Sequence, residues 1–161
     1  MKPVARDPCA LNTMWESIRK SDNEPFVCDL GLGHGVTHSK YTSSGKRNVI
    51  PKWAPPESFG PGYVATYEGD VWSLACVLLE LFTGYRLWQN IVGNKLGQVL
   101  SMNEVLARFF HGNVTPNILS LVDIAAVRNA LQSCFTKEKE KRPSAKDLTE
   151  IFEGALLSVN E

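Results

Sequence analysis

The sequence predicts a mainly α-helical fold with one short β-hairpin near its start. Four segments between residues 70 and 156 have apolar residues at helical spacing. Near the N-terminus, the short apolar segments 13–15 and 26–28 are typical of strands, and the polar stretch 16–24 would turn between them. Residues 30–52 are rich in Gly, Ser, Thr and Lys and have no sustained apolar period, so we expect a long loop there.

The first and strongest predicted helix spans residues 70–83. Asp70 is a suitable N-cap, and Gly84 is a suitable stop because glycine adopts the left-handed conformation without a steric penalty. Apolar side chains occur on nearly all sides of this helix, at Val71, Trp72, Leu74, Ala75, Cys76, Val77, Leu78, Leu79, Leu81 and Phe82. A surface helix has one apolar stripe, so we expect this helix to be central and covered on most sides.

Three further helices are predicted after it. The second runs from about Met102 to His111 and ends before Gly112. The third lies around residues 119–135, where helical spacing relates Leu121, Ile124, Val127, Leu131 and Cys134. The fourth begins at Ser144, with Asp147 three residues on as an approximate capping box. Its apolar face consists of Leu148, Ile151, Phe152, Ala155 and Leu156.

Composition favours one soluble globular domain, or a large piece of one. The chain has 161 residues, of which 43% are hydrophobic and 21% are charged. The 17 basic and 17 acidic residues balance, so the bulk charge indicates neither a nucleic acid nor a membrane surface as a partner. The longest apolar stretch, residues 74–82, contains Glu80 and is too short to span a bilayer, and residues 1–10 lack the apolar run of a signal peptide. We therefore expect a cytoplasmic protein.

The four cysteines lie far apart, at Cys9, Cys28, Cys76 and Cys134. No two of them form a Cys-x-x-Cys pair, which argues against a zinc site or a disulfide framework. We expect buried free thiols in a reducing compartment.

The first motif that carries chemistry is Arg6-Asp7 followed by Asn12. It has the Arg-Asp-x-x-x-x-Asn spacing of the protein kinase catalytic loop. Phosphoryl transfer requires a carboxylate to accept the proton of the attacking hydroxyl group, and oxygen ligands that hold Mg²⁺ against the phosphates. Asp7 suits the first role, and the side-chain carbonyl of Asn12 suits the second. On its own, this spacing is equally consistent with a loop salt bridge beside a turn asparagine.

A second motif, Asp29-Leu30-Gly31, follows the predicted strand 26–28. The strand delivers a carboxylate at its end, and Gly31 permits a sharp turn of the backbone. This segment resembles the D-F-G segment of kinases, whose Asp binds the metal. Taken alone it is also a common strand-to-turn sequence, but the ordered pair of motifs with a short hairpin between them is much less common.

Three later motifs complete the series. Pro51–Ser58 resembles the end of the activation segment in several tyrosine kinases. Asp70–Ser73 resembles the opening of the kinase F helix. Cys134 with Arg142-Pro143 matches the C-x7-R-P pattern before the last helix. In that family the Glu and the Arg at these positions form a buried ion pair, so the resemblance implies a pair between Glu57 and Arg142. Removal of one partner would leave a buried charge, at a cost of about 3–5 kcal/mol.

The five motifs, in one order, resemble the C-terminal lobe of the protein kinase superfamily, without the N-terminal lobe. The resemblance divides the partial domain 1–161 into catalytic and metal-binding loops (1–29), an activation segment (29–58) and a helical subdomain (69–161). It implies ATP-dependent phosphoryl transfer to Tyr or Ser/Thr hydroxyl groups of a protein substrate. Asp7 would be the base, Asn12 and Asp29 the ligands of Mg²⁺ and ATP, and Asp70 the anchor of the catalytic loop. A non-catalytic, pseudokinase-type interaction module that binds a partner protein is the alternative.

The chain also departs from the family pattern. It has no Gly-rich phosphate loop, no Val-Ala-Ile-Lys lysine and no helix-borne Glu partner, and residues 31–35 lack the required glycine spacing. A helix that packs on the F helix in kinases is missing too. The apolar sides of residues 71–82 would then be partly bare, at about 1.5–3 kcal/mol per large exposed side chain. We expect a fragment, an incomplete gene product or a subunit that a partner covers.

Several motif positions are substituted. The replacements are Ala5 for the usual His, Leu30 for Phe, Pro55 for Ala and Ala75 for Gly. The three residues with chemical roles, at positions 7, 12 and 29, are retained, so the magnesium half-site is complete in sequence. Lys52-Trp53, the Pro-Pro-Glu-Ser sequence and Cys134 favour tyrosine kinases or the tyrosine-kinase-like group. Lys52 and Trp53 also belong to the stretch that shapes the substrate-peptide groove in kinases.

Residues 32–48 contain several hydroxyl side chains, among them Tyr41 and Thr42. In the family, the Arg beside the catalytic Asp pairs with a phosphorylated activation loop. A phosphate on Tyr41 or Thr42 could therefore bind Arg6 through charge-assisted hydrogen bonds and order the loop. The alternative is that these residues only fill a flexible loop.

Overall fold

The structure, a computed structural model, describes residues 3–4, 34–35, 52–93 and 95–159. The two predicted strands at 13–15 and 26–28 lie outside the described residues, as does most of the predicted loop 30–52. Within that loop, the two-residue strand β2 (His34–Gly35) pairs antiparallel with β1 (Pro3–Val4).

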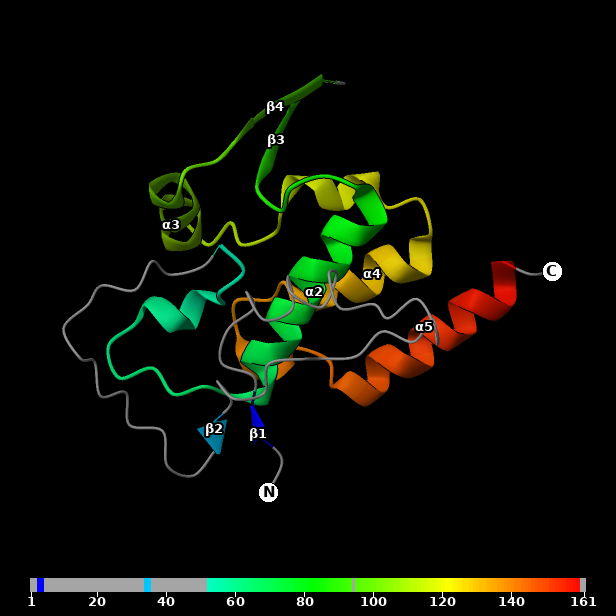
Figure 1. The fold of residues 1–161 in the computed structure, drawn as a ribbon, viewed down its shortest axis with the longest axis horizontal. Coiled ribbons are helices and arrows are strands. Elements are labelled where there is room, and N and C mark those ends of the chain that lie inside the picture. Colours follow the sequence, from blue (N-terminus) through cyan, green and yellow to red (C-terminus); the bar gives the residue numbers. More distant parts are fainter. Residues whose placement is uncertain (1–2, 5–33, 36–51, 94, 160–161) are drawn as a thin grey trace, which may run out of the picture.

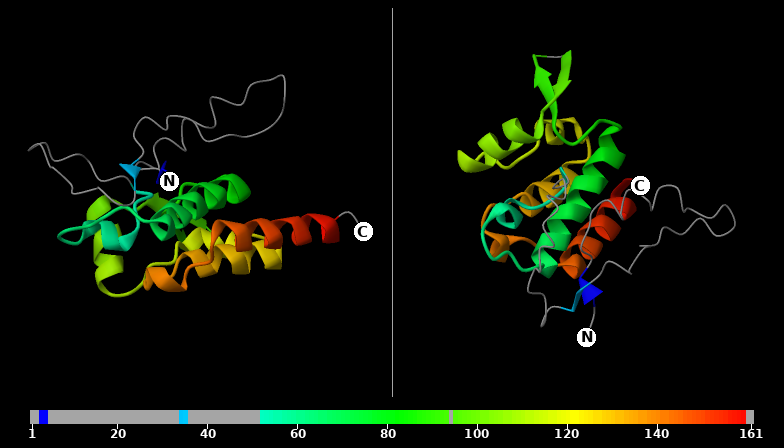
Figure 2. Two further views of the ribbon diagram at one scale, coloured as in Figure 1. Left: turned by 90° about the horizontal axis from the view of Figure 1, so that it is seen from below. Right: turned by 60° about the vertical axis from the view of Figure 1, so that its left-hand side comes forward.

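The described helices gather around one central helix, α2 (Tyr67–Thr83). It packs against α4 (Ala125–Cys134), which in turn packs against α5 (Ala145–Val159). Figure 1 shows α2 in the middle, with α3 (Met102–Phe110) and the hairpin β3–β4 toward one end, and Figure 2 shows α4 and α5 stacked along one side of it. The prediction of a mainly helical fold is confirmed. None of the described helices has both the length and the apolar character needed to cross a membrane.

Helix α2 starts earlier than the sequence predicts. Its N-cap is Thr66, whose hydroxyl accepts a hydrogen bond from the Gly69 N–H at 3.1 Å. The predicted N-cap, Asp70, is wrong, because its own N–H already donates to the Thr66 carbonyl at 3.2 Å within the first turn. The predicted stop is confirmed: Gly84 has φ = 70°, a left-handed conformation that costs glycine nothing, and its N–H donates to the Glu80 carbonyl.

The two ends of α2 differ in how far they are covered. Its first four turns contribute buried side chains to the core, at Val71, Trp72, Ala75, Cys76 and Leu79. Near its C-terminal end, Leu81 and Phe82 keep 47% and 46% of their surface exposed. The prediction of a central, mostly covered helix therefore holds for its first part, and the prediction of partly bare apolar sides is confirmed at its end.

The core is organised around the Trp72 ring. Phe109 of α3 and Phe135 after α4 meet this ring edge to face, with centroids 5.8 Å and 5.1 Å away. Trp88 also meets the Phe109 ring edge to face, with centroids 5.4 Å apart. These contacts bring α2, α3 and the end of α4 into one hydrophobic cluster.

Helix α3 is confirmed to within one residue. It begins with a complete capping box between Ser101 and Glu104, and it ends at Phe110, before Gly112 with φ = 75°. The fourth predicted helix is also confirmed, as α5: the Ser144 N–H donates to Asp147 Oδ2 at 2.8 Å, and the Asp147 N–H donates to Ser144 Oγ at 3.2 Å.

Two details of the later helices are wrong in the prediction. Residues 119–135 do not form one helix, because the extended residues Val122 and Ile124 separate the 3₁₀ turn η3 (Asn117–Leu121) from α4. In α5, the predicted apolar face is only partly buried. Leu148 and Ala155 are covered, whereas Ile151 and Leu156 are exposed.

The hairpin of β3 (Gln89–Val92) and β4 (Lys95–Val99) was not predicted. Its sequence signal is the Gly93-Asn94 dipeptide between two short apolar runs, which is typical of a two-residue hairpin turn. Gly93 has φ = 61°, as such a turn requires. This hairpin begins directly after Trp88, so it is attached to the core at its base.

Candidate functional site

The described part of the candidate site centres on residues 52–58 and their partners on α2 and near Arg142. The segment enters the 3₁₀ turn η2 (Pro56–Phe59) through Pro55 as N-cap and Pro56 at the first position. Proline suits this position because its fixed φ matches a helical turn and the first N–H groups have no partner there. Ser58 Oγ donates to the Pro55 carbonyl at 2.6 Å and closes the turn, which presents Glu57 toward the protein interior.

The predicted ion pair between Glu57 and Arg142 is present. Arg142 Nη1 lies 2.7 Å from Glu57 Oε1, and Nη2 lies 2.8 Å from Oε2, so the pair is bidentate. The Arg142 side chain is 0% exposed and that of Glu57 is 21% exposed. Such a buried pair joins two segments that are 85 positions apart in sequence.

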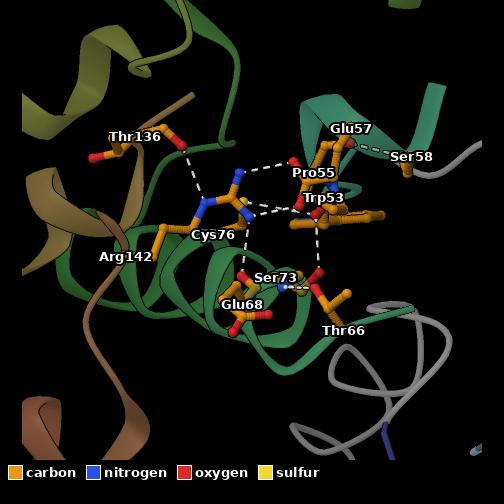
Figure 3. A network of polar contacts seen from close by, with 11 residues as sticks. Trp53, Pro55, Glu57, Ser58, Thr66, Glu68, Ser73, Cys76, Thr136 and Arg142 are labelled. Atoms are coloured by element: carbon orange, nitrogen blue, oxygen red, sulfur yellow. Dashed lines mark hydrogen bonds and ion pairs between the residues drawn. The ribbon is translucent and has the colours of Figure 1, made fainter. Parts of the chain in front are cut away.

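Two further N–H donors of Arg142 bind backbone carbonyls. Nη1 donates to the Glu68 carbonyl at 3.0 Å and Nε donates to the Thr136 carbonyl at 3.1 Å (Figure 3). The guanidinium plane lies over the Trp72 ring, 5.0 Å from its centroid, where a cation is attracted to the ring face. Arg142 therefore fixes η2 against the start of α2 and against the end of α4 at the same time.

Residues Lys52 and Trp53 are held to the core through both their backbone and their side chains. The Trp88 indole N–H donates to the Lys52 carbonyl at 2.8 Å, and Ser73 Oγ donates to the Trp53 carbonyl at 3.2 Å. The Lys52 ammonium group donates to the Leu100 carbonyl, at 2.7 Å. The segment is thus attached both to α2 and to the base of the β3–β4 hairpin.

Glu80 is a residue of this site that the sequence analysis missed. Its Oε2 accepts from the Trp53 indole N–H at 3.1 Å, and its Oε1 accepts from the Leu87 backbone N–H at 2.8 Å. The carboxylate therefore joins α2, the Trp53 segment and the chain before β3. The available signal was that Glu80 is the one charged residue in the apolar stretch 74–82, since a carboxylate in such a place needs partners.

Residues 1–152 match the family of protein tyrosine and serine/threonine kinases. The chain belongs to this family.

Several growth factor receptors are similar to this kinase chain. Platelet-derived growth factor receptor alpha of Gallus gallus is 31% identical over 134 residues, which are 81% of this chain and 11% of the receptor. Vascular endothelial growth factor receptor 3 of Mus musculus is 29% identical over 157 residues, or 97% of this chain and 10% of the receptor. The BDNF/NT-3 growth factors receptor of Gallus gallus is 35% identical over 84 residues, or 51% of this chain and 10% of that receptor.

These findings confirm the resemblance to a protein kinase and its lean toward the tyrosine-kinase-like group. The kinase chain spans about a tenth of the length of the curated relatives it matches.

The predicted site residues of this kinase chain divide into two sets. Glu57, Asp70 and Arg142 are described, and Asp70 lies partly buried in the first turn of α2. The others lie outside the described residues and stay predictions: Arg6, Asp7, Asn12, Asp29, Tyr41 and Thr42.

Two buried cysteines lie near the Arg142 site of the kinase chain. Burial raises the pKa of the Cys76 thiol well above its ordinary value, and the nearby Glu80 carboxylate raises it further. Burial also raises the pKa of Cys134 to about 12. Both side chains are free thiols, and their burial and raised pKa are typical of structural rather than reactive cysteines. The prediction of buried free thiols is confirmed for these two, and Cys9 and Cys28 lie outside the described residues.

Proposed function

We propose that this chain is the catalytic and helical part of a protein kinase domain that transfers the γ-phosphate of ATP to a protein hydroxyl group. The observation that carries the proposal is the family match over residues 1–152, which spans Asp7, Asn12 and Asp29 at the family's motif spacing. We divide the domain into the loops 1–29, the activation segment 29–58 and the helical subdomain 69–161.

In this proposal Asp7 accepts the proton of the attacking hydroxyl group. Asn12 and Asp29 hold Mg²⁺, which would neutralise charge on the phosphates of ATP as the group transfers. Their side chains supply an amide carbonyl and a carboxylate, the hard oxygen donors that suit this ion. Arg6 pairs with a phosphate on Tyr41 or Thr42 and so orders the activation segment.

The described residues support a positioning role beside this chemistry. Arg142 fixes Glu57 and the turn η2, while α2 and the hairpin base hold Lys52 and Trp53. We propose that this fixed segment forms one wall of the groove for the substrate peptide, with Asp70 anchoring the catalytic loop from α2. Precise placement matters because phosphoryl transfer depends mainly on positioning and electrostatics.

The tyrosine-kinase-like relatives favour tyrosine as the acceptor residue and a cytoplasmic location for this part of the protein. A second candidate is a pseudokinase-type module that binds partner proteins without catalysis. Ala5, where the family usually has His, favours this alternative, because that ring normally supports the D-F-G backbone.

The test is Mg²⁺-dependent transfer of radiolabelled phosphate from ATP to a tyrosine-containing polymer by the purified chain and by Asp29→Asn. Asp123→Asn, which makes the same chemical change at an exposed position, is the matched control. We expect weak transfer, because the chain carries no Gly-rich loop, and we expect Asp29→Asn to abolish it while Asp123→Asn retains it. Equal transfer in all three would contradict the proposed site. No transfer, together with no effect of Asp29→Asn on Mn²⁺ binding measured by water-proton relaxation, would favour the non-catalytic module.

A further inference from the structure

Helix α3 has more apolar surface than the core covers. Val105 and Phe109 are buried on one side of this helix. Leu106 and Phe110 follow them by one residue and form a second apolar row at i, i+4 spacing. Phe110 is 85% exposed, and Leu106 is only partly buried.

A groove of about 350 Å³ lies beside this second row. Its other side is formed by Pro56 and Phe59 of η2, and Lys137 lies at its edge. Phe59 and Phe109 pack edge to face with centroids 5.9 Å apart, so the two sides of the groove are in direct contact. Figure 1 shows α3 and the turn after residue 55 on the same side of α2.

One side of the groove is held in place before any partner binds. Glu57 of the same turn is bound by Arg142 through both of its carboxylate oxygens. A preformed groove avoids much of the ordering cost of association, which favours binding.

The charges that line the groove are complementary to an acidic partner. Glu57 is a lining residue, but its charge is already neutralised by Arg142. Lys137 forms no ion pair with any residue that the structure describes, so its positive charge is available to a ligand. A partner with carboxylates beside a large apolar side chain matches both the apolar lining and this cation.

We propose that this groove, lined by Pro56, Phe59, Leu106, Phe110 and Lys137, is a docking site for a short segment of a partner protein. The segment presents one or two large apolar side chains next to Asp or Glu residues. The apolar side chains fill the groove beside Phe110, and a carboxylate binds Lys137. This binding function goes beyond phosphoryl transfer and does not require it, because it uses none of the residues at positions 7, 12 and 29.

The test uses the full chain and a short fluorescein-labelled peptide with a central Leu-Phe pair between Asp and Glu flanks. Fluorescence anisotropy measures its Kd, and two control peptides replace either Leu-Phe by Ser-Ser or the acidic residues by Lys. Phe110→Ala is expected to raise Kd about tenfold, as truncation of an aromatic anchor does. The matched control, Val92→Ala, changes an apolar residue that is 67% exposed on the hairpin and should leave Kd unchanged.

Lys137→Glu sharpens the test of charge. We expect this variant to bind the acidic peptide several-fold more weakly and to prefer the Lys-flanked peptide, because the sign of the groove's edge is reversed. Circular dichroism of each variant verifies that it is folded, and both substituted side chains lie at the surface of the groove.

Three outcomes would overturn the proposal. They are no saturable binding of the acidic peptide to the folded chain, equal binding by Phe110→Ala, and equal binding of the acidic and Lys-flanked peptides. A fourth result would also overturn it: a dimer in sedimentation that Phe110→Ala dissociates would show that a second copy fills the groove instead. Asp29→Asn is expected to bind the peptide like the unaltered chain, so failure of docking and failure of the phosphotransfer proposal are separately visible.

Discussion

Two carboxylates, Glu57 and Glu80, fix the segment of residues 52–58 to the rest of the molecule, and their partners differ in kind. Glu57 binds the charged guanidinium of Arg142 through both oxygens. Glu80 binds two neutral donors, the Trp53 indole and the Leu87 backbone N–H. The pair between Glu57 and Arg142 follows from a sequence motif. The bonds of Glu80 come from an indole and a backbone N–H, donors that almost any sequence contains. Charged pairs at motif positions can therefore be predicted from sequence, whereas hydrogen bonds from neutral donors to a lone carboxylate need the fold.

The largest expected effect comes from breaking the charged pair. Arg142→Ala leaves Glu57 without its partner and removes the cation over Trp72, so we expect the free energy of unfolding to fall by about 3–5 kcal/mol. Urea unfolding followed by circular dichroism measures this loss. Arg128→Ala is the control, because Arg128 donates to the neutral Val122 carbonyl, at 2.8 Å, and should cost only about 0.5–1.5 kcal/mol. Similar losses in the free energy of unfolding in the two variants would show that the ion pair stabilises the fold no more than an ordinary hydrogen bond does.

A smaller effect is expected from removal of the Glu80 carboxylate, whose two donors are neutral. Glu80→Ala leaves the Trp53 indole and the Leu87 N–H without acceptors, at a cost of about 1–3 kcal/mol. The same denaturation experiment measures it, and faster hydrogen exchange at the Leu87 amide would locate the change. Glu150→Ala on α5 serves as control, since the Glu150 pair with Lys146 is exposed and spans 3.7 Å. An unchanged Leu87 amide in Glu80→Ala would mean that this carboxylate does not hold the segment.

The same contrast explains how much of the molecule was predictable. The centre of α2 and the pairing of Glu57 with Arg142 were predicted, because a long apolar run and the family's motifs carry that information. The start of α2 was wrong, since both Thr66 and Asp70 are good capping residues and only the backbone path selects between them. The break in residues 119–135 was missed because helical spacing of apolar residues continues across the extended residues Val122 and Ile124.

Two features near the candidate site, the β3–β4 hairpin and the exposure of Phe110, could not be predicted for a different reason. The β3–β4 hairpin is short and its apolar runs are brief, so its Gly93-Asn94 signal is easily overlooked among helices. Phe110 was counted as part of a helix, but its 85% exposure depends on how α3 packs on Phe59 and Trp72. Exposure of an apolar residue on an amphipathic helix is set by tertiary packing, and sequence periodicity alone does not determine it.

The smallest expected effect concerns two capping carboxylates that, unlike Glu57 and Glu80, are fully exposed. Hydrogen bonds from Ser144 lower the pKa of Asp147, and those from Ser101 lower the pKa of Glu104. A pKa that is lower in the folded state adds stability above the ordinary pKa of the group, and this stability is lost as the pH falls through the folded value. Thermal melts between pH 7 and pH 2.5 should therefore show that Asp147→Asn reduces the acid-induced fall in Tm.

Lys141→Ala is the control for this comparison, because it removes an exposed charge that does not affect the pKa of Asp147 and leaves the Ser144–Asp147 hydrogen bonds in place. It should keep the acid-induced fall in Tm that Asp147→Asn reduces. The effect must be small, because exposed carboxylates are screened by water and salt, whereas the Glu57 side chain is only 21% exposed and pairs with the fully buried Arg142. A fall in Tm that is identical in Asp147→Asn and the unaltered chain would mean that the α5 cap does not contribute to acid sensitivity.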